Sequence, residues 1–198
     1  MKKVLLQLAL LIVIIILGYM IYNTIQAPVR FKKEKQRREL VVINKLKSIR
    51  TSQLIYKRMR GSFAGNFDTL ESFLATAEIP VVKIIPDPAD TTFTKTINDT
   101  VGYIRVEDTL FKHQPFTLKE LAIIPFSGGE KFQMAADTIQ RGGVLVHVFQ
   151  VLAPYSAYLK GMDKQRIINL QAERENTDRY PGLKLGSLTE ASTDGNWE

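Results

Sequence analysis

Near the N-terminus, residues 4–22 form an apolar run of nineteen residues with no charged side chain and one polar interruption, Gln7. A helix of that length spans roughly 30 Å, which is the thickness of the hydrocarbon core of a bilayer. Only a helix can satisfy its own backbone hydrogen bonds in lipid. The run therefore predicts a transmembrane helix over residues 4–22, preceded by a cytoplasmic stub of residues 1–3 and followed by the rest of the chain.

The same run resembles a signal peptide, because Lys2 and Lys3 provide a short positive stretch before it. The apolar part of a signal peptide is only 7–15 residues long and ends at a small-x-small cleavage site. Here the run is longer, and residues 23–27 contain no A-x-A pattern. We therefore expect an uncleaved signal anchor, with a cleaved signal peptide and a helix buried in a soluble core as the alternatives.

Two observations disagree about the orientation of this helix. Six basic residues lie between positions 30 and 38, so a positive-inside count places the C-terminal side in the cytoplasm. A start with Met-Lys-Lys before a leucine- and isoleucine-rich run is instead typical of an exported chain. We expect a single-pass inner-membrane protein with its C-terminal domain in the periplasm, and the opposite orientation stays open.

Composition limits the chemistry of the remaining chain, which is long enough for one domain with a real core. The chain has no cysteine, which excludes disulfides, thiolate catalysis and cysteine-ligated metal sites. The net charge of +7 is unevenly placed: residues 30–60 carry twelve Lys/Arg against two Glu, whereas residues 61–198 carry 13 basic and 18 acidic residues. The basic character therefore belongs to one segment next to the membrane.

That basic segment has two interpretations. It is either a solvated helix face or a contact with anionic lipid headgroups, worth about 1 kcal/mol per residue near the surface. Nucleic-acid binding is not expected, because the segment is tethered to the membrane and lacks interleaved aromatic residues. The headgroup candidates are Arg30, Lys32, Lys33, Lys35, Arg37 and Arg38.

A basic amphipathic helix is predicted over residues 28–60, because Pro28 ends or kinks the preceding helix and Gly61 follows the last helical turn. One face of it, offered to a partner helix, is formed by Val42, Leu46, Ile49, Gln53 and Tyr56. Neighbouring apolar residues widen this stripe, and Lys45, Lys47 and Arg50 are expected mainly outside it. A stripe this wide is more typical of packing against a domain than of a coiled-coil dimer, which remains the alternative.

Residues 61–198 are predicted to form an α+β globular domain with short helices and a mostly antiparallel sheet. We expect a short helix capped by Asp68, a strand over 81–85, β-formers over 91–96, and a hairpin of 101–106 with 109–116. A capping box at 117–120 opens one helical turn. A second hairpin pairs 131–135 with 144–152, a helix capped by Asp163 covers 164–173, and a last strand covers 183–188. Trp197 is expected to dock on this domain.

The first part of the chain contains several short sequence motifs. Residues 49–53 read IRTSQ, and Tyr-Lys, Gly-Ser-Phe and Phe-Asp-Thr-Leu follow at positions 56, 61 and 67. Together with the order of apolar helix, amphipathic helix and sheet, residues 1–75 resemble the type IV pilins and the pseudopilins of type II secretion. The resemblance implies a component of a secretion or pilus-like apparatus. The chain has no prepilin peptidase site of the Gly-Phe-Thr-Leu-Ile-Glu type, and convergence on a similar architecture is the alternative.

Five of the nine aspartates are followed by threonine and then by an aliphatic residue or threonine. These triplets resemble the O-glycosylation signal of Bacteroidota, which modifies exported proteins, so the resemblance implies a periplasmic or surface-facing domain. The alternative is that Asp-Thr pairs cap helices and open strands. The candidate acceptors are Thr69, Thr91, Thr100, Thr109 and Thr138.

No catalytic constellation stands out in the sequence. His147 lies in an apolar strand and His113 is distant from it, so a zinc site is not expected, and residues 127–131 lack the spacing of a phosphate-binding loop. We expect no cofactor, no metal and no small-molecule substrate. The predicted role is a non-enzymatic binding or structural component of a cell-envelope assembly, with inner-membrane lipid, other envelope proteins and further copies of the chain as partners. An accessory subunit or sensor acting through the basic helix, or a membrane-tethered enzyme, are the alternatives.

Overall fold

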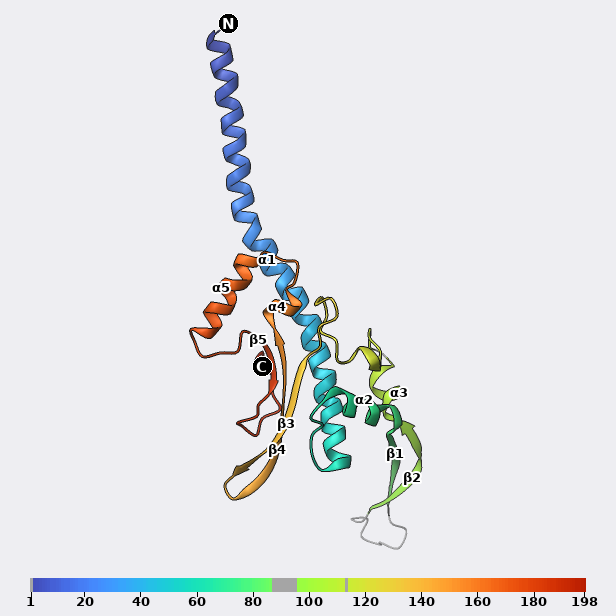
Figure 1. Cartoon of the computed structure of the whole chain (residues 1–198). Coiled ribbons are helices and arrows are strands. Elements are labelled where there is room, and N and C mark those ends of the chain that lie inside the picture. The colour runs from blue at the N-terminus through green and yellow to red at the C-terminus, as the bar shows by residue number, and fades with distance from the viewer. Residues whose placement is uncertain (1, 87–95, 113) are drawn as a thin grey trace.

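The computed structural model describes residues 2–86, 96–112 and 114–198. One helix, α1 (Lys2–Arg60, 59 residues), joins the apolar run to the globular part without interruption (Figure 1). Pro28 lies inside this helix, so the expected boundary between two helices is wrong. Proline removes one backbone hydrogen bond, and the intact bonds in the turns before and after it carry the helix across that position.

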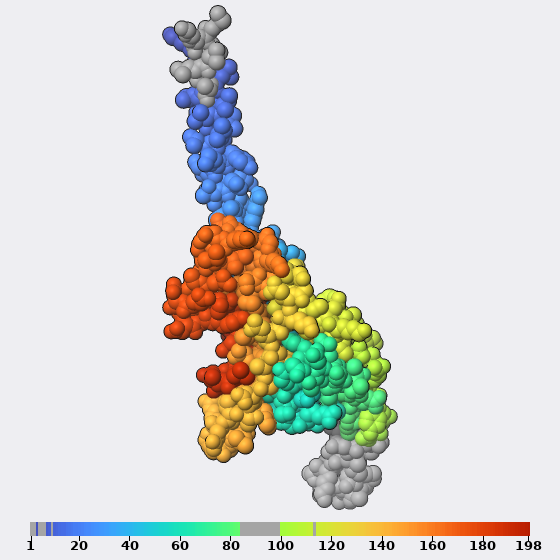
Figure 2. Space-filling view, viewed as in Figure 1, coloured from blue at the N-terminus to red at the C-terminus, as the bar shows by residue number. Residues whose placement is uncertain are grey.

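The first half of α1 projects away from the rest of the molecule, as Figures 1 and 2 show. Its large apolar side chains are exposed all round the helix, from 51% at Val13 to 68% at Tyr19. Among the described residues, one helix is long and apolar enough to cross a membrane, and that helix is α1. It is compatible with a single-pass anchor and also with a signal sequence.

The second half of α1 is the central element of the core. Val42, Leu46 and Ile49 are fully buried and pack in one hydrophobic cluster with strands of the main sheet. That sheet has three strands in the order β3-β4-β5: β3 (Gln133–Arg141), β4 (Val144–Pro154) and β5 (Gly182–Gly186). All of its pairings are antiparallel, so the mixed helical and antiparallel class predicted from the sequence is confirmed.

The hairpin of β3 and β4 matches its prediction, although β3 continues beyond residue 135. Gly142 and Gly143 form its two-residue turn with φ of 59° and 81°. Two successive positive φ values are typical of turns that match the twist of the flanking strands, and glycine adopts them without steric cost. The turn chemistry therefore fixes the register that places Thr138 opposite His147.

Strand β5 forms one edge of the sheet, and the C-terminal tail follows it. A Cβ atom on Gly186, where φ is 69°, would lie 2.3 Å from the carbonyl oxygen of Phe149, so only glycine fits there. Trp197 is partly buried against the core, as predicted, and Arg50 Nη1 lies 2.9 Å from a carboxylate oxygen of Glu198. The tail is thus fastened to the same helix that carries the apolar run.

A second layer lies on the other side of α1 and contains α2 (Phe67–Thr76), β1 (Glu78–Pro86), β2 (Thr96–Arg105) and α3 (Val106–Phe111). Helix α2 begins at Phe67, with Asn66 Oδ1 accepting the Thr69 amide at 2.8 Å, so the cap is Asn66 and not Asp68. Leu70 and Leu74 are buried, as expected.

The predicted hairpin of residues 101–106 with 109–116 is wrong. Strand β2 pairs antiparallel with β1, and the chain turns into α3 at Val106. The Val106 amide still donates to the Ala77 carbonyl at 3.0 Å, in register with the β1–β2 ladder. The physical reason for the turn is that the Val106 side chain is fully buried in the core, which fixes the point where α3 begins. Residues 91–95 of the expected β-rich stretch lie outside the described residues.

The remaining helices are short. The 3-10 turn η1 (Leu118–Glu120) is where a capping box was predicted, and the Glu120 carboxylate accepts the Thr117 amide at 2.9 Å. Helix α4 (Tyr155–Tyr158), which was not predicted, follows β4 directly. Helix α5 (Lys164–Glu175) begins with Asp163 accepting the Arg166 amide, as predicted, and lies beside the point where α1 enters the globular part (Figure 1).

Candidate functional site: a groove beside Lys45 and a basic collar

The face of α1 that was assigned to a partner helix is occupied by this chain's own domain. Val42, Leu46, Ile49 and Gln53 are all fully buried, and the Tyr56 ring packs edge-to-face on another ring of the core at 4.9 Å. This corrects the assignment to a partner, because four of the five residues have no accessible surface and Tyr56 is partly buried against the core. It agrees with the observation that the stripe is wide enough for a domain.

Two of the six basic headgroup candidates are fixed inside the molecule. Arg38 Nη1 donates to the carbonyl oxygens of Tyr158 at 3.1 Å and Lys160 at 2.9 Å. Lys35 Nζ lies 2.7 Å from a carboxylate oxygen of Glu39. Arg38 thus holds α4 and the following loop against α1, whereas the Lys35–Glu39 pair lies within α1. Both side chains are partly buried in these contacts, so the assignment of Arg38 and Lys35 to lipid is corrected.

The Glu34 carboxylate accepts hydrogen bonds from two guanidinium groups. It accepts from Arg37 at 2.8 and 2.7 Å and from Arg38 at 2.9 Å, and these hydrogen bonds lower the pKa of its carboxyl group to about 2. Both guanidinium groups also lie over the Phe126 ring, at 5.5 and 5.0 Å from its centroid. Arg37 is thus paired, although it lies at the surface.

The other three headgroup candidates are exposed and close together along α1, and we call them the basic collar: Arg30, Lys32 and Lys33. It lies where the apolar half of α1 meets the globular part (Figure 2). Phe31, within the collar, is partly buried and packs against the core, and Arg166 of α5 lies 5.9 Å from its ring centroid. The globular part therefore begins at the first charged residue after the apolar run.

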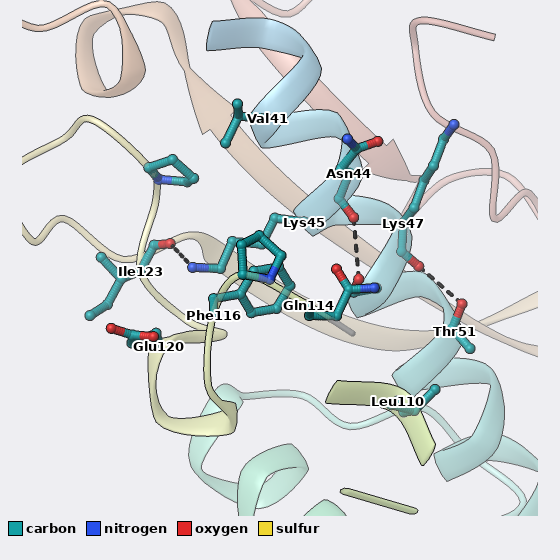
Figure 3. A pocket seen from close by; sticks show the side chains of 13 residues that line it. Val41, Asn44, Lys45, Lys47, Thr51, Leu110, Gln114, Phe116, Glu120 and Ile123 are labelled. Atoms are coloured by element: carbon teal, nitrogen blue, oxygen red, sulfur yellow. Dashed lines mark hydrogen bonds between the residues drawn. The ribbon is translucent and has the colours of Figure 1, made fainter. Parts of the chain in front are cut away.

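A groove of about 780 Å³ runs along the other side of α1, between this helix and residues 110–125 (Figure 3). Its apolar walls come from Val41 on α1, Leu110 on α3, and the segment after α3. Polar side chains of α1 line it as well, at Asn44, Lys45, Lys47, Ser48 and Thr51. Among the described residues, this is the hollow that best combines apolar walls with a charged group.

Lys45 is the buried cation of this groove, with 5% of its surface exposed. Its Nζ donates to the Ile123 carbonyl at 2.7 Å and lies 4.8 Å from the centre of the Phe116 ring (Figure 3). Burial lowers the pKa of the ammonium group to about 8, and the nearby Glu120 carboxylate opposes this shift. A buried side chain with a perturbed pKa in a cleft is a common mark of a functional site.

The charges around Lys45 are few. Lys47 is exposed at the rim of the groove, and Glu120 faces it from η1. The Glu120 carboxylate accepts both the amide and the hydroxyl of Thr117, at 2.9 and 3.0 Å, and these bonds lower its pKa. Glu120 is thus held by the turn that it closes and does not form a direct ion pair with Lys45 in the described structure.

The candidate glycosylation sites differ in their surroundings. Thr69, Thr100, Thr109 and Thr138 are exposed, and Thr91 lies outside the described residues. The Thr138 hydroxyl lies 2.8 Å from Nδ1 of the partly buried His147, and the Thr138 amide donates to Asp137 at 2.7 Å. Exposure leaves these threonines accessible, but it does not select modification over a purely local role of each Asp-Thr pair.

Residues 127–131 form a loop closed by a bridge between Ile123 and Lys131. The Ser127 hydroxyl donates inward to the Ile124 carbonyl at 2.8 Å, which agrees with a hairpin loop. His113 lies outside the described residues. Among the described residues, no three histidine or acidic side chains gather in a way that could hold a metal ion.

The groove was missed by the reasoning from sequence, because Lys45 was placed outside the buried stripe of α1. Its spacing carried the signal: Lys45 is three residues after Val42 and four before Ile49, which puts it on the same helical face as both. The opposite wall comes from residues far away along the chain, and no local pattern indicates that they meet α1.

Comparison with known proteins gives no relative: no family model, no curated protein and no solved structure matches this chain.

Proposed function

We propose that this protein is a single-pass inner-membrane protein whose periplasmic domain acts without catalysis, as a binding or structural component of a cell-envelope assembly. The observation that carries the proposal is the continuity of α1. One helix of 59 residues is exposed and apolar in its first half and forms the core of the globular part in its second half. Such a helix holds the domain at a fixed distance from the bilayer, because no flexible linker lies between them.

The exposed apolar half supports a membrane location on energetic grounds. Leu10, Ile14 and Tyr19 are among a long series of side chains that remain at least half exposed, on all faces of the helix. Each such side chain gains about 1.5–3 kcal/mol when it leaves water. A bilayer covers all faces at once, whereas one partner helix covers a single stripe. Lipid is therefore the environment that best fits this half of α1.

Retention of the anchor is supported by the local structure after the apolar run. Residues 23–27, where a signal peptide would be cleaved, are helical, and the Thr24 hydroxyl donates to the Met20 carbonyl at 2.8 Å within the helix. Cleavage there would divide the helix that enters the core. The uncleaved anchor is the form in which α1 has a role for its whole length.

The spacing along α1 supports a position of the globular part close to the membrane surface. Phe31, where contacts with the core begin, lies nine positions after Tyr22, the end of the apolar run. At about 1.5 Å per residue that is about 13 Å. The headgroup layer occupies roughly half of this distance. The flexible side chains of the basic collar can cover the remainder and meet lipid phosphates.

The side of the globular part away from the membrane then remains as the surface for partners in the envelope. The resemblance of residues 1–75 to pilins and pseudopilins supports a secretion or pilus-like apparatus as the assembly. The exposed Asp-Thr-aliphatic triplets support an exported domain. The positive-inside count opposes that orientation, so topology is the first property to measure.

The absence of cysteine makes that measurement direct. Single cysteines replace Lys119 in the globular part and Lys3 before the anchor, and a membrane-impermeant maleimide is added to intact spheroplasts. The proposal predicts labelling at Lys119→Cys and none at Lys3→Cys until the cells are lysed. The opposite pattern would place the globular part in the cytoplasm. Cross-linking with mass spectrometry in the same membranes should then recover stoichiometric envelope partners.

The second candidate is an accessory subunit or sensor that acts through the basic collar. The observation in its favour is that the collar residues Arg30, Lys32 and Lys33 are exposed at the membrane end of the globular part. Arg38 and Lys35, in contrast, are engaged in contacts within the protein. Replacing the three collar residues by glutamine should abolish function with partners still bound if this candidate is right. Loss of the partners together with function would favour the assembly component.

A further inference from the structure

We propose that the groove beside Lys45 is a binding site for a small carboxylate that carries an apolar group, such as an aryl or short alkyl chain. The proposal does not rest on the membrane topology, because every residue that it uses lies in the globular part. Three features carry it: an ammonium group with spare donors, a small excess of positive charge, and apolar walls of limited extent.

The first feature is the hydrogen-bonding state of Lys45. An ammonium group has three donors. One of them is used by the Ile123 carbonyl at 2.7 Å, and the Phe116 ring lies 4.8 Å from Nζ. The side chain lines the groove and is 95% removed from solvent (Figure 3). A buried cation is costly unless it is paired with an opposite charge and hydrogen-bonded. A carboxylate that enters the groove would supply that charge and accept the remaining hydrogen bonds of the Lys45 ammonium group.

The second feature is the local charge. Lys45 and Lys47 contribute two positive charges, and Glu120 contributes one negative charge that is bound to Thr117. The groove thus carries one excess positive charge. A monoanion such as a carboxylate balances it, whereas a phosphate group with nearly two negative charges would exceed it. Charge-assisted hydrogen bonds to a carboxylate are also about twice as strong as neutral ones.

The third feature is the size and lining of the groove. Val41, Leu110 and Phe116 face the same space, with two prolines of the segment after α3. The volume of about 780 Å³ lies within the roughly 300–1,000 Å³ of small-molecule sites. Thirteen residues line it, fewer than the ~20–30 residues that each partner gives to a stable protein interface. A small ligand fits the groove better than a protein partner.

Phenylbutyrate is a suitable probe, because it combines an aromatic ring with a carboxylate and its alcohol, phenylbutanol, provides an uncharged control. Titration of the full-length protein in nanodiscs, followed by calorimetry at pH 7, should give saturable binding of one phenylbutyrate. Empty nanodiscs measure partitioning into lipid. We expect the alcohol to bind at least tenfold more weakly. Equal affinity for the two compounds, or no saturable binding of phenylbutyrate, would overturn the proposal.

Two variants test the site itself. Lys45→Met keeps the length of the side chain and removes the charge, so it should weaken phenylbutyrate binding at least tenfold, whereas Lys119→Met, at an exposed lysine outside the groove, should leave it unchanged. Val41→Trp fills the groove from its exposed rim and keeps the charge of Lys45, so it should abolish binding. Unchanged affinity in Val41→Trp would refute the site even if Lys45→Met failed to fold.

Discussion

Gln53 offers the sharpest test of how α1 is built into the globular part. Its side chain is fully buried, and Nε2 donates to the Ala64 carbonyl at 2.9 Å while Oε1 accepts the Ala64 amide at 2.9 Å. One side chain thus satisfies both backbone groups of a residue that is only 1% exposed. The two bonds hold the loop that leads from α1 into α2 against the helix.

Gln53→Leu leaves two buried backbone groups without partners and keeps a similar side-chain volume. Each orphaned group costs about 1–3 kcal/mol, so the pair costs about 2–6 kcal/mol. The extra apolar burial of leucine offsets about 1–2 kcal/mol. From the middle of these two ranges we expect the free energy of unfolding to fall by about 2.5 kcal/mol. Gln36→Leu makes the same exchange at an exposed position of the same helix and should change it by less than about 0.5 kcal/mol.

The single tryptophan supplies the assay. Trp197 is partly buried against the core, so its fluorescence reports unfolding of the globular part in urea with the apolar half of α1 held in detergent. Near-ultraviolet circular dichroism provides a second probe of the same transition. If the Gln53→Leu protein is as stable as the Gln36→Leu protein, the two hydrogen bonds from Gln53 to the Ala64 backbone do not hold the loop against α1. That result would refute the reasoning.

Three further predictions concern the core, the sheet and the groove. Leu46→Ala should lower the free energy of unfolding by about 2–5 kcal/mol, because the side chain is fully buried, whereas Leu40→Ala, at a position 62% exposed, should change it by less than ~1 kcal/mol in the same urea titration. Gly186→Ala should cost more than ~2 kcal/mol in thermal unfolding, because the new Cβ would lie 2.3 Å from the Phe149 carbonyl oxygen at a φ of 69°. Burial lowers the pKa of Lys45 from 10.5 to about 8, so the folded protein releases this proton at lower pH than the unfolded chain. The free energy of unfolding of the unchanged protein, relative to that of Lys45→Met, should therefore rise between about pH 8 and 10.5. If urea titrations at pH 7.5 and pH 10 give the same difference between the two proteins, the assignment is refuted.

Much of the fold could be predicted from local patterns. The apolar run, the stripe on the following helix, the Gly-Gly hairpin and the cap at Asp163 all carry their own signal within a few residues, and the structure confirms each as an element. The break expected at Pro28 fails, because a proline effect of about 3 kcal/mol is small beside the packing and propagation of a long helix.

The errors lie where tertiary contacts decide the outcome. The strand-forming residues after position 101 favour a hairpin with the next segment. In the structure, Val106 is instead buried in the core next to Ala77, and α3 begins there. The roles of the basic residues are decided in the same way. Arg38 and Lys45 look like surface cations in the sequence, but carbonyl groups more than seventy residues away receive their hydrogen bonds. No local pattern encodes such partners.

The central claim is that α1 stays attached and runs unbroken from the bilayer into the globular part. Nitroxides on Ile12→Cys, Ile16→Cys and Lys32→Cys, measured one at a time by electron paramagnetic resonance in the full-length protein in lipid bilayers, test it directly, because oxygen concentrates in hydrocarbon and a nickel chelate stays in water. We expect oxygen to dominate at the first two positions and the nickel chelate to dominate at the third. Equal access of the nickel chelate to all three positions, or a mature protein that lacks the labelled isoleucines, would contradict the account.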